Sequence, residues 1–364
     1  MDRQANQKEW PGRVHAALRA LWFRVRIRRS RFLVRRPELL ARRPLPDLDA
    51  LFDGYVFEHK DTRPLSTAPT VLQPCHLCGY DGSAFERLYQ DLQNVDSHGA
   101  EIVRCPECAM VIMRPRVRDL GDSWWNARSY LEDCLLPRML DMSQIDATGR
   151  FDAAHNWIVQ LPLVAALHAI PEGFPRRVLD VGCSFGGLVH ALTIAGFEAA
   201  GLEPAEHVAL FGRAMLGVDI RIGTYEALRQ ECDLPCIALT EVLEHCFDPL
   251  DALRHVHGAL RKGGLLFLSV PNFDTDARRE QGSSWENFVS DHYSQFTIET
   301  LGRMLQKAGF ERIVTCTDIG FPLLRRDLDG ERVRALQRSM APAATQHLGA
   351  ERKNPAIYAW ALKG

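Results

Sequence analysis

Short apolar runs alternate with helical patterns from residue 176 onward. The runs of strand length are RRVLDVG, EAAGLE, VDIRIG, CIALTEV, GLLFLSV, ERIVTCTDI and AIYAWALK. Helical spacing of apolar positions separates them in LVHALTIAG, HVALFGRAML, PLDALRHVHGALR and TIETLGRMLQKAG. Strands that alternate with helices in this way run parallel and carry helices on both faces. The pattern predicts an α/β fold, a Rossmann-like doubly wound sheet of seven mostly parallel strands.

Other segments define the remaining organisation. Residues 126–170 show mainly a helical pattern, with a break expected near Pro162. Residues 324–354 fit no strand and predict a helical insertion before the last strand. The predicted regions are a basic amphipathic arm (1–45), a linker (46–70), a small cysteine-containing module (71–125), a helical connector (126–170) and the α/β domain (171–364).

The composition is that of an ordinary globular chain, with 46% hydrophobic and 25% charged residues among 364. No apolar run approaches the roughly 20 residues that span a bilayer, and arginines interrupt each apolar stretch near the N-terminus. We therefore expect a cytoplasmic protein, in which six dispersed cysteines stay reduced as small buried side chains. These are Cys134, Cys183, Cys232, Cys236, Cys246 and Cys316.

Charge is distributed unevenly along the chain. Residues 1–43 hold thirteen Arg or Lys and three acids, a charge of +10 against −2 for the whole chain. Apolar residues recur there at helical spacing, including Val14, Leu18, Leu21, Trp22 and Val25. Residues 13–43 are therefore a candidate contact with an anionic membrane surface or polyanion, which would make the protein peripheral to a membrane. Docking on nucleic acid and a solvated tail are the alternatives.

A glycine-containing turn follows the first strand of the α/β domain. Gly182, Gly186 and Gly187 allow the backbone to approach a ligand closely. Glu203 ends the second strand 21 residues after Gly182, where a carboxylate can accept hydrogen bonds from ribose hydroxyls. A nicotinamide-binding turn would read G-x-G-x-x-G, which Ser184 breaks, so that class is rejected.

Three more motifs follow in order: TEVLEHCFDPLDAL (Thr240–Leu253), LRKGGLLFLSVPN (Leu260–Asn272) and DHYSQFTIETLGRMLQKAGF (Asp291–Phe310). Together with the glycine turn, this set resembles the class I S-adenosylmethionine-dependent methyltransferases. The resemblance covers about Arg176–Thr315 and the last strand. It departs from the usual D-x-G-x-G-x-G at Ser184, which stands in place of the middle glycine and is expected to weaken cofactor affinity.

The resemblance implies S-adenosylmethionine as cofactor and assigns roles to matching positions. Asp180, Gly182, Cys183 and Gly186 would border the methionine part, and Glu203, followed by Pro204, would bind the ribose. Thr224 or Tyr225 would lie near the adenine. Thr240 and Glu241 would face the methyl-transfer cleft, with Pro271 and Asn272 on the same rim.

A methyl group on a sulfonium is already activated, so few catalytic groups are needed. Oxygen or carbon acceptors would benefit from a general base with a pKa near neutrality. The candidates are His292, Tyr293, His245 and Glu241, each of which has packing or helix capping as its alternative role.

Two C-x-x-C pairs, Cys75 with Cys78 and Cys105 with Cys108, lie 26 residues apart. Each pair places two thiolates on one side of a tight turn, and two such turns close the tetrahedral S₄ site of structural Zn²⁺. The alternatives are a redox pair or disulfides. His76 is either a spare ligand or an exposed neighbour of this zinc ribbon.

These features predict S-adenosylmethionine-dependent methyl transfer to a small-molecule or glycan-type acceptor, nucleotide-sugars included, with a structural or substrate-holding ribbon. An RNA methyltransferase is the first alternative. Nucleic acid is disfavoured because residues 71–122 hold eight acids and five arginines. A non-catalytic scaffold of the same fold is the second alternative.

Overall fold

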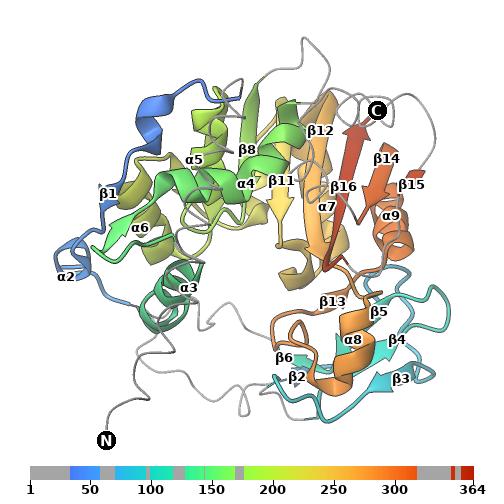
Figure 1. The fold of residues 1–364 in the computed structure, drawn as a ribbon. Helices are drawn as coiled ribbons and strands as arrows, with labels where there is room; N and C mark the ends of the chain where they lie inside the picture. Colours follow the sequence, from blue (N-terminus) through green and yellow to red (C-terminus); the bar gives the residue numbers. More distant parts are fainter. Residues whose placement is uncertain are drawn as a thin grey trace, which may run out of the picture.

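The computed structural model describes residues 33–57, 70–95, 99–117, 128–142, 144–168, 176–317, 346–348 and 354–364. A sheet with the strand order β10-β9-β8-β11-β12-β16-β14-β15 forms its centre (Figure 1). Its strands are β8 (Arg177–Val181), β9 (Glu198–Glu203), β10 (Ile220–Ile222), β11 (Leu234–Thr240), β12 (Leu260–Pro271), β14 (Phe310–Cys316), β15 (Gln346–Leu348) and β16 (Ala356–Lys363). Only β16 runs antiparallel to its neighbours. The predicted mostly parallel, doubly wound sheet is confirmed.

The sheet has one strand more than the seven predicted. Residues 346–348, expected within a helical insertion, instead pair parallel with Val314–Cys316 of β14. The prediction is wrong at these residues because the outer edge of β14 offers backbone groups that a short strand can satisfy. Residues 324–345 and 349–353 of that insertion lie outside the described part.

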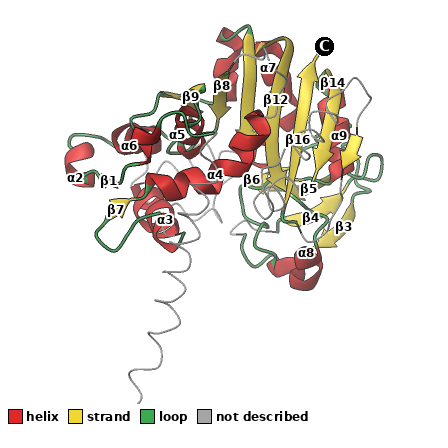
Figure 2. Cartoon of the chain, turned by 45° about the horizontal axis from the view of Figure 1, so that its top comes forward, coloured by secondary structure: helices red, strands yellow, loops and turns green. Residues whose placement is uncertain are grey.

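Helices cover both faces of the sheet because successive strand residues point to opposite sides. One face carries α4 (Ala153–His168) and α5 (Gly187–Ile194), which pack on Val178 and Phe267. Figure 2 shows α4 crossing this face. The opposite face carries α7 (Pro249–Ala259) and α9 (Ile298–Lys307), which pack on strand residues such as Leu179 and Leu239. A further helix, α6 (Glu206–Leu216), packs near the β10 edge.

The connector differs from its prediction in one respect. It forms a π-helix (Tyr130–Leu135), α3 (Leu136–Asp141), the short strand β7 (Arg150–Phe151) and α4. The break expected near Pro162 is absent, since α4 runs through this residue. A proline in a helix interior costs about 3 kcal/mol, and burial of Trp157, Ile158 and Val164 on the sheet offsets that cost.

Part of the predicted linker is packed on the α/β domain. A 3₁₀ helix (Pro37–Leu40) precedes β1 (Arg43–Pro44), which pairs with β7, and α2 (Leu48–Leu51) follows. Phe52 is buried against the core that contains Phe211. The linker prediction for 46–70 is therefore wrong for residues 46–57, whose apolar side chains find a partner surface. Residues 1–32 of the basic arm and residues 58–69 lie outside the described part.

The small module shares a sheet with the α/β domain. Its strands β3 (Glu86–Tyr89), β4 (Glu101–Arg104) and β5 (Val111–Arg114) are joined by β13 (Ser294–Gln295), in the order β13-β5-β4-β3. A second pair joins β2 (Thr70–Val71) to β6 (Arg116–Val117). The module lies beside α8 (Asp276–Gln281), next to the end of β12 (Figure 1). Within the described residues, no helix is long and apolar enough to cross a membrane.

Candidate active site

The carboxyl ends of the central parallel strands bring the predicted cofactor residues to one edge. Asp180 in β8 pairs in register with Gly201 of β9 and Ala238 of β11. Thr240, at the end of β11, pairs with Ser269 of β12. Ligands of open α/β sheets collect at this edge, as the sequence predicted.

Two glycines of the turn after β8 have no room for a side chain. Gly182 has φ +73°, and a Cβ there would lie 2.4 Å from Val242. Gly186 has φ +82°, and a Cβ would lie 2.8 Å from Val218. Ser184, between them, also adopts a positive φ of 51°. Its N–H donates to Glu203 Oε2 at 2.8 Å, a bond that ties the turn to the end of β9 and does not require a glycine.

Glu203 and Asp180 form a buried acidic pair. Glu203 accepts backbone N–H bonds from Ser184 and, at 3.0 Å, from Ala205, which leaves lone pairs on both carboxylate oxygens. Burial raises the pKa of Glu203 to about 6, against the two backbone bonds that lower it. Burial and then the charge of Glu203 raise the pKa of Asp180 to about 8.

Asp180 Oδ1 is buried and lacks a hydrogen-bond partner among the described residues. Such atoms in native proteins are satisfied by a ligand or water. An aminoacyl nucleoside fits these residues, because its ammonium and ribose hydroxyls are donors and the site offers acceptors beside a glycine cradle.

The other predicted cofactor residues lie in different environments. Thr224 caps a 3₁₀ helix (Tyr225–Gln230), and Tyr225 is half-buried with its ring 5.6 Å from that of His255. Cys183 is buried and occupies the space next to Gly201, where an added Cβ would meet its Sγ at 2.3 Å. The Cys183 side chain thus packs on the sheet, while Pro204 is exposed directly after Glu203.

A cluster of titratable side chains lies after β11. His245, in a 3₁₀ turn (Leu243–His245), has Nδ1 3.1 Å from Asp291 Oδ2 and Nε2 4.0 Å from Glu244 Oε1. Its ring centroid lies 4.5 Å from that of His292 at an interplanar angle of 81°. Glu241 has φ +54°, and its Oε1 accepts the Ser269 hydroxyl at 2.7 Å.

The two histidines have opposite protonation preferences. Burial lowers the pKa of His245, but the Asp291 contact and the charges of Glu244 and Glu241 outweigh it and raise the pKa to about 9. Burial and then the charge of His245 lower the pKa of His292 to about 4. At neutral pH, His245 is therefore an imidazolium and His292 a neutral imidazole.

The hydrogen bond of His292 defines its reactive atom. Nδ1 lies 3.0 Å from the carbonyl oxygen of Asn287, an acceptor, so Nδ1 carries the proton and donates it. The lone pair is then on Nε2. Among the four predicted candidates for a base, His292 is neutral at pH 7 and has its lone pair on Nε2, and its lowered pKa makes it a weaker base than an unperturbed histidine.

Burial raises the pKa of both carboxyl groups near these histidines. Burial and then the charge of Glu241 raise the pKa of Glu244 to about 8, and burial also raises the pKa of Glu241, although this residue borders solvent. Ligand atoms of Glu244, His245 and His292 lie within 4.8 Å of one another, a separation short enough for a cation. A protonated His245 has no lone pair for a metal, so acid–base chemistry is favoured here.

Tyr293 contributes to packing. Its side chain is 3% exposed, with the ring 6.0 Å from Phe247, and its N–H donates to the Glu244 carbonyl at 2.9 Å. The role as base remains a prediction for Tyr293, Glu241 and His245, whose geometry supports it less than that of His292. Sequence reasoning overlooked Asp291, the partner of His245, although it directly precedes His292 in the same motif.

The four predicted zinc ligands converge. Cys75 and Cys108 have their Sγ atoms 3.4 Å apart, Cys78 and Cys105 have theirs 3.5 Å apart, and all four Sγ atoms lie within 4.8 Å of one another. A tetrahedral zinc with Zn–S bonds of about 2.3 Å separates its sulfurs by about 3.8 Å. Burial raises the pKa of Cys108 to about 11, so a bound dication is needed to keep this thiol ionised. The donor set fits structural zinc.

The backbone of each C-x-x-C turn explains the convergence. Gly79 N–H donates to the Cys75 carbonyl at 2.8 Å, and Ala109 N–H donates to the Cys105 carbonyl at 3.0 Å. No disulfide forms among the described cysteines. Of the six dispersed cysteines, Cys232 is exposed and Cys134 is partly exposed, so the expectation of burial is wrong for these two. Both lie on loops or helices at the surface of the domain.

His76 joins the ribbon to the segment that follows His292 and is neither a ligand nor an exposed neighbour. Arg116 donates to His76 Nε2 at 3.1 Å, and His76 Nδ1 lies 2.7 Å from Ser294 Oγ. Burial and the charge of Arg116 lower the pKa of His76 to about 3. The predicted role fails because four cysteines already complete the tetrahedral set.

Arg116 holds the loop after β11 from the ribbon side. It is 4% exposed, donates to the Phe247 carbonyl, and has its guanidinium carbon 3.3 Å from the Phe247 ring centroid. Met113 N–H donates to the Tyr293 carbonyl at 3.0 Å. The ribbon thus contacts both loops that carry the histidine pair. No sequence pattern singled out Arg116 for this contact.

Comparison with known proteins identifies the domain. Residues 158–315 match the family described as "Methyltransferase domain". A ubiquinone biosynthesis O-methyltransferase of Xanthomonas campestris pv. campestris is 35% identical over 121 residues, covering 31% of this chain and 49% of the relative. The corresponding enzyme of Ruegeria pomeroyi is 31% identical over 150 residues, covering 38% of this chain and 60% of the relative. The chain thus spans about half to three fifths of the length of these curated relatives.

Among solved structures, an S-adenosylmethionine-dependent methyltransferase of Thermotoga maritima, described as a possible histamine N-methyltransferase, is 20% identical. It matches with a TM-score of 0.43 over 65% of this chain and 98% of that chain. The family match, together with the glycine turn, Glu203 and the sheet order, identifies a class I S-adenosylmethionine-dependent methyltransferase domain in this chain.

Proposed function

We propose that this chain transfers a methyl group from S-adenosylmethionine to a hydroxyl of a small-molecule acceptor, with sugars and nucleotide-sugars among the candidates. The observation that carries the proposal is the neutral His292, beside the His245–Asp291 ion pair, in a domain that also holds the Asp180–Glu203 pair. The relatives named as O-methyltransferases support an oxygen acceptor.

Cofactor binding is assigned to the acidic pair and the glycine turn. Glu203 would accept hydrogen bonds from the ribose hydroxyls with its remaining lone pairs, and Asp180 Oδ1 would accept a hydrogen bond from the ammonium group of the cofactor. When bound, S-adenosylmethionine supplies a methyl group already activated by its positive sulfur. The protein therefore needs to orient the acceptor and receive one proton.

Proton transfer is assigned to His292. The acceptor hydroxyl gives its proton to Nε2, and the Asn287 carbonyl keeps the ring in the required tautomer. The neighbouring His245 imidazolium disfavours a second positive charge and so holds His292 in the neutral form before reaction. Tyr130, from the connector, is half-buried, and burial, then Cys134 and the charge of Glu203, raise its pKa to about 12. It would help to exclude water.

The ribbon is proposed to bind structural zinc and to hold the histidine loops through His76 and Arg116. The contact of residues 13–43 with a membrane or polyanion also remains a proposal, because residues 13–32 of that segment lie outside the described residues.

Methyl transfer from labelled S-adenosylmethionine should be measured against phenolic hydroxyls, nucleotide-sugars and RNA in parallel. Wild type should methylate a small-molecule pool, while Glu203→Ala should lose cofactor binding by calorimetry. A wild type that binds no cofactor would support the scaffold alternative and refute the enzyme. Transfer confined to RNA would support the first alternative.

A further inference from the structure

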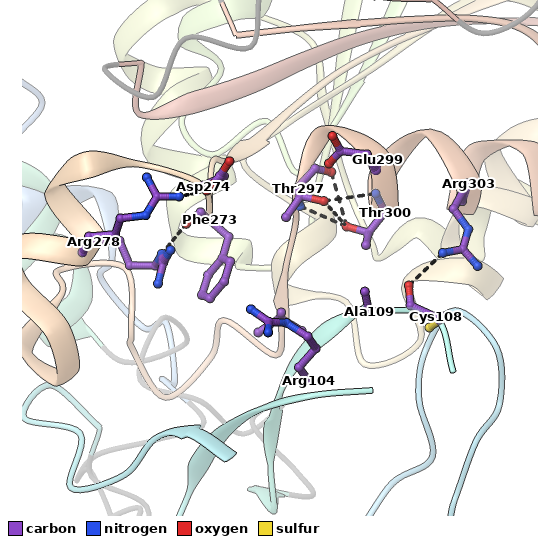
Figure 3. Close-up of a pocket in the computed structure, with 12 residues that line it drawn as sticks. Arg104, Cys108, Ala109, Phe273, Asp274, Arg278, Thr297, Glu299, Thr300 and Arg303 are labelled. Carbon is purple, nitrogen blue, oxygen red and sulfur yellow. Dashed lines mark hydrogen bonds and ion pairs between the residues drawn. The ribbon is translucent and has the colours of Figure 1, made fainter. Parts of the chain in front are cut away.

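A cavity lies between the zinc ribbon and the α/β domain (Figure 3). Its volume is about 470 Å³. One wall is the turn between β4 and β5 of the ribbon, and the other is formed by α8 and the start of α9. None of the residues assigned to cofactor binding or proton transfer lines it. Its size suits a small organic ligand, since such pockets measure about 300–1,000 Å³.

Four arginines line this groove: Arg104, Arg278, Arg279 and Arg303. Two of them are neutralised, because Arg104 pairs with Glu86 at 2.9 Å and Arg279 pairs with Asp274. The other two are held by neutral acceptors. Arg303 donates to the Cys108 carbonyl at 2.8 Å, and Arg278 donates to the Phe273 carbonyl and, at 2.5 Å, to the Tyr89 hydroxyl.

Arg278 is the more informative of these two. It is 9% exposed and its guanidinium lies 4.1 Å from the Phe273 ring centroid, yet no carboxylate pairs with it within the described part of the chain. A buried charge without a counter-ion is costly, and an anion in the groove would relieve that cost. Arg303 adds a second guanidinium, which donates to the Cys108 carbonyl and forms no ion pair within the described residues.

The first turn of α9 faces the same groove. Thr297 and Thr300 form a capping box there, and this ten-residue helix directs the positive end of its dipole toward the cavity. Arg104 lies across the groove from these threonines, while Glu299 points away from Arg104 (Figure 3). Its carboxylate therefore does not occupy the space between the arginines and the helix.

We propose that this groove binds a phosphate-bearing small molecule, with the phosphate oxygens between Arg278, Arg303 and the start of α9. Guanidinium groups present paired N–H donors that match phosphate oxygens, and backbone N–H groups at a helix start complete such a site. The phosphate belongs either to a nucleoside diphosphate ester or to a free inorganic anion. The inference does not rest on methyl transfer, because binding can be measured without the reaction.

Calorimetry on the full-length, zinc-containing protein tests the site with three probes: inorganic phosphate, inorganic pyrophosphate and a uridine or thymidine diphosphate sugar. We expect binding that weakens at least tenfold in Arg303→Gln and in Arg278→Gln. Arg303→Lys should recover part of it. Arg177→Gln is the matched control, because Arg177 is exposed at the opposite end of the sheet.

Zinc content and thermal unfolding show whether Arg303→Gln has disturbed the ribbon through its bond to Cys108. If it has, Arg278→Gln decides, since Arg278 bonds to no ligand cysteine in the described structure. Tighter binding of the sugar nucleotide than of pyrophosphate identifies an ester, and equal affinities identify a free anion. Absence of binding by all three probes, or affinities unchanged in Arg303→Gln and Arg278→Gln, overturns the proposal.

Discussion

The two proposed halves of the site, a cofactor half around Glu203 and an acceptor half around His292, are built from different kinds of contacts. The cofactor half comes from one strand–turn–helix–strand unit, in which Gly182, Ser184 and Glu203 are joined by backbone geometry and bonds over 21 residues. The acceptor half depends on contacts between distant parts of the sequence, such as His245 with Asp291. His76 and Ser294, which also contact each other, are 218 residues apart. The cofactor half can be predicted from sequence because its contacts are local, whereas the acceptor half depends on how the whole chain packs.

We expect the largest effect on activity from substitution of the proposed base, His292. His292→Gln should lower kcat about 10²- to 10⁴-fold, because proton transfer loses its acceptor, while cofactor affinity stays within about threefold. Calorimetry for cofactor and steady-state kinetics for the acceptor would measure the two halves separately. An equal loss in both, with the fold intact by circular dichroism, would contradict the assignment of His292 to the acceptor half.

Removing zinc should be the next largest perturbation. A chelator strong enough to strip the Cys75–Cys108 site should lower acceptor turnover roughly 10- to 100-fold, since His76 and Arg116 then no longer hold the histidine loops. Cofactor affinity should change much less. Restoring activity with added Zn²⁺ is the control, and full activity in a metal-free sample would show that the ribbon does not position these loops.

A glycine substitution targets the cofactor half. Gly182→Ala places a Cβ 2.4 Å from Val242 at a positive φ, so the free energy of unfolding should fall by roughly 1–3 kcal/mol and cofactor affinity should fall with it. Gly263→Ala is the matched control, because Gly263 also has positive φ but a Cβ added there would meet no atom within 4 Å. Equal cofactor losses in both variants would show that crowding at Val242 is not the cause.

The smallest expected effect is a pH dependence of stability that comes from His245. The pKa of His245 is raised to about 9 in the folded protein, against about 6.5 in the unfolded chain. The resulting stabilisation is fully present below about pH 6.5 and is lost as the pH rises through about 9. His245→Gln should therefore lower the free energy of unfolding by roughly 1–3 kcal/mol more at pH 6 than at pH 9.5. Denaturant unfolding at both pH values would measure it.

His292 supplies the matching control with the opposite sign. Its pKa is lowered to about 4, so it destabilises the fold as the pH falls from about 6.5 toward 4. The His292→Gln variant should therefore lose less free energy of unfolding than wild type as the pH falls over this range. A His245→Gln penalty that is the same at both pH values would show that the Asp291 pair does not hold His245 in its charged form.

Sequence patterns predicted the elements in which local periodicity and packing agree. The strands β8, β9 and β11, the glycine turn and the converging cysteines are examples, because each depends on spacing within a short segment. The unbroken helix through Pro162 could not be predicted, since tertiary burial overrides the local propensity.

Contacts on the acceptor side could not be predicted either, because they join residues far apart in the sequence. His76 and Arg116 carry no pattern that points to Ser294 or Phe247, and only the pairing of β5 with β13 brings them together. The short strand at residues 346–348 likewise depends on an open edge of β14 that is formed elsewhere in the chain. Contacts of this kind are set by topology, which a single sequence does not encode in its local spacing.

The strand β13 has a consequence for folding cooperativity. Ser294 and Gln295 complete a sheet whose other three strands lie between residues 86 and 114, and Ile112 and Met110 belong to the same core as Leu301 of α9. The segment of family similarity, residues 158–315, is therefore smaller than the unit that folds together. An autonomous fragment beginning at Arg176 would lack a partner strand for β13 and would expose part of this core. The inherited domain and the cooperative unit of this protein have different boundaries.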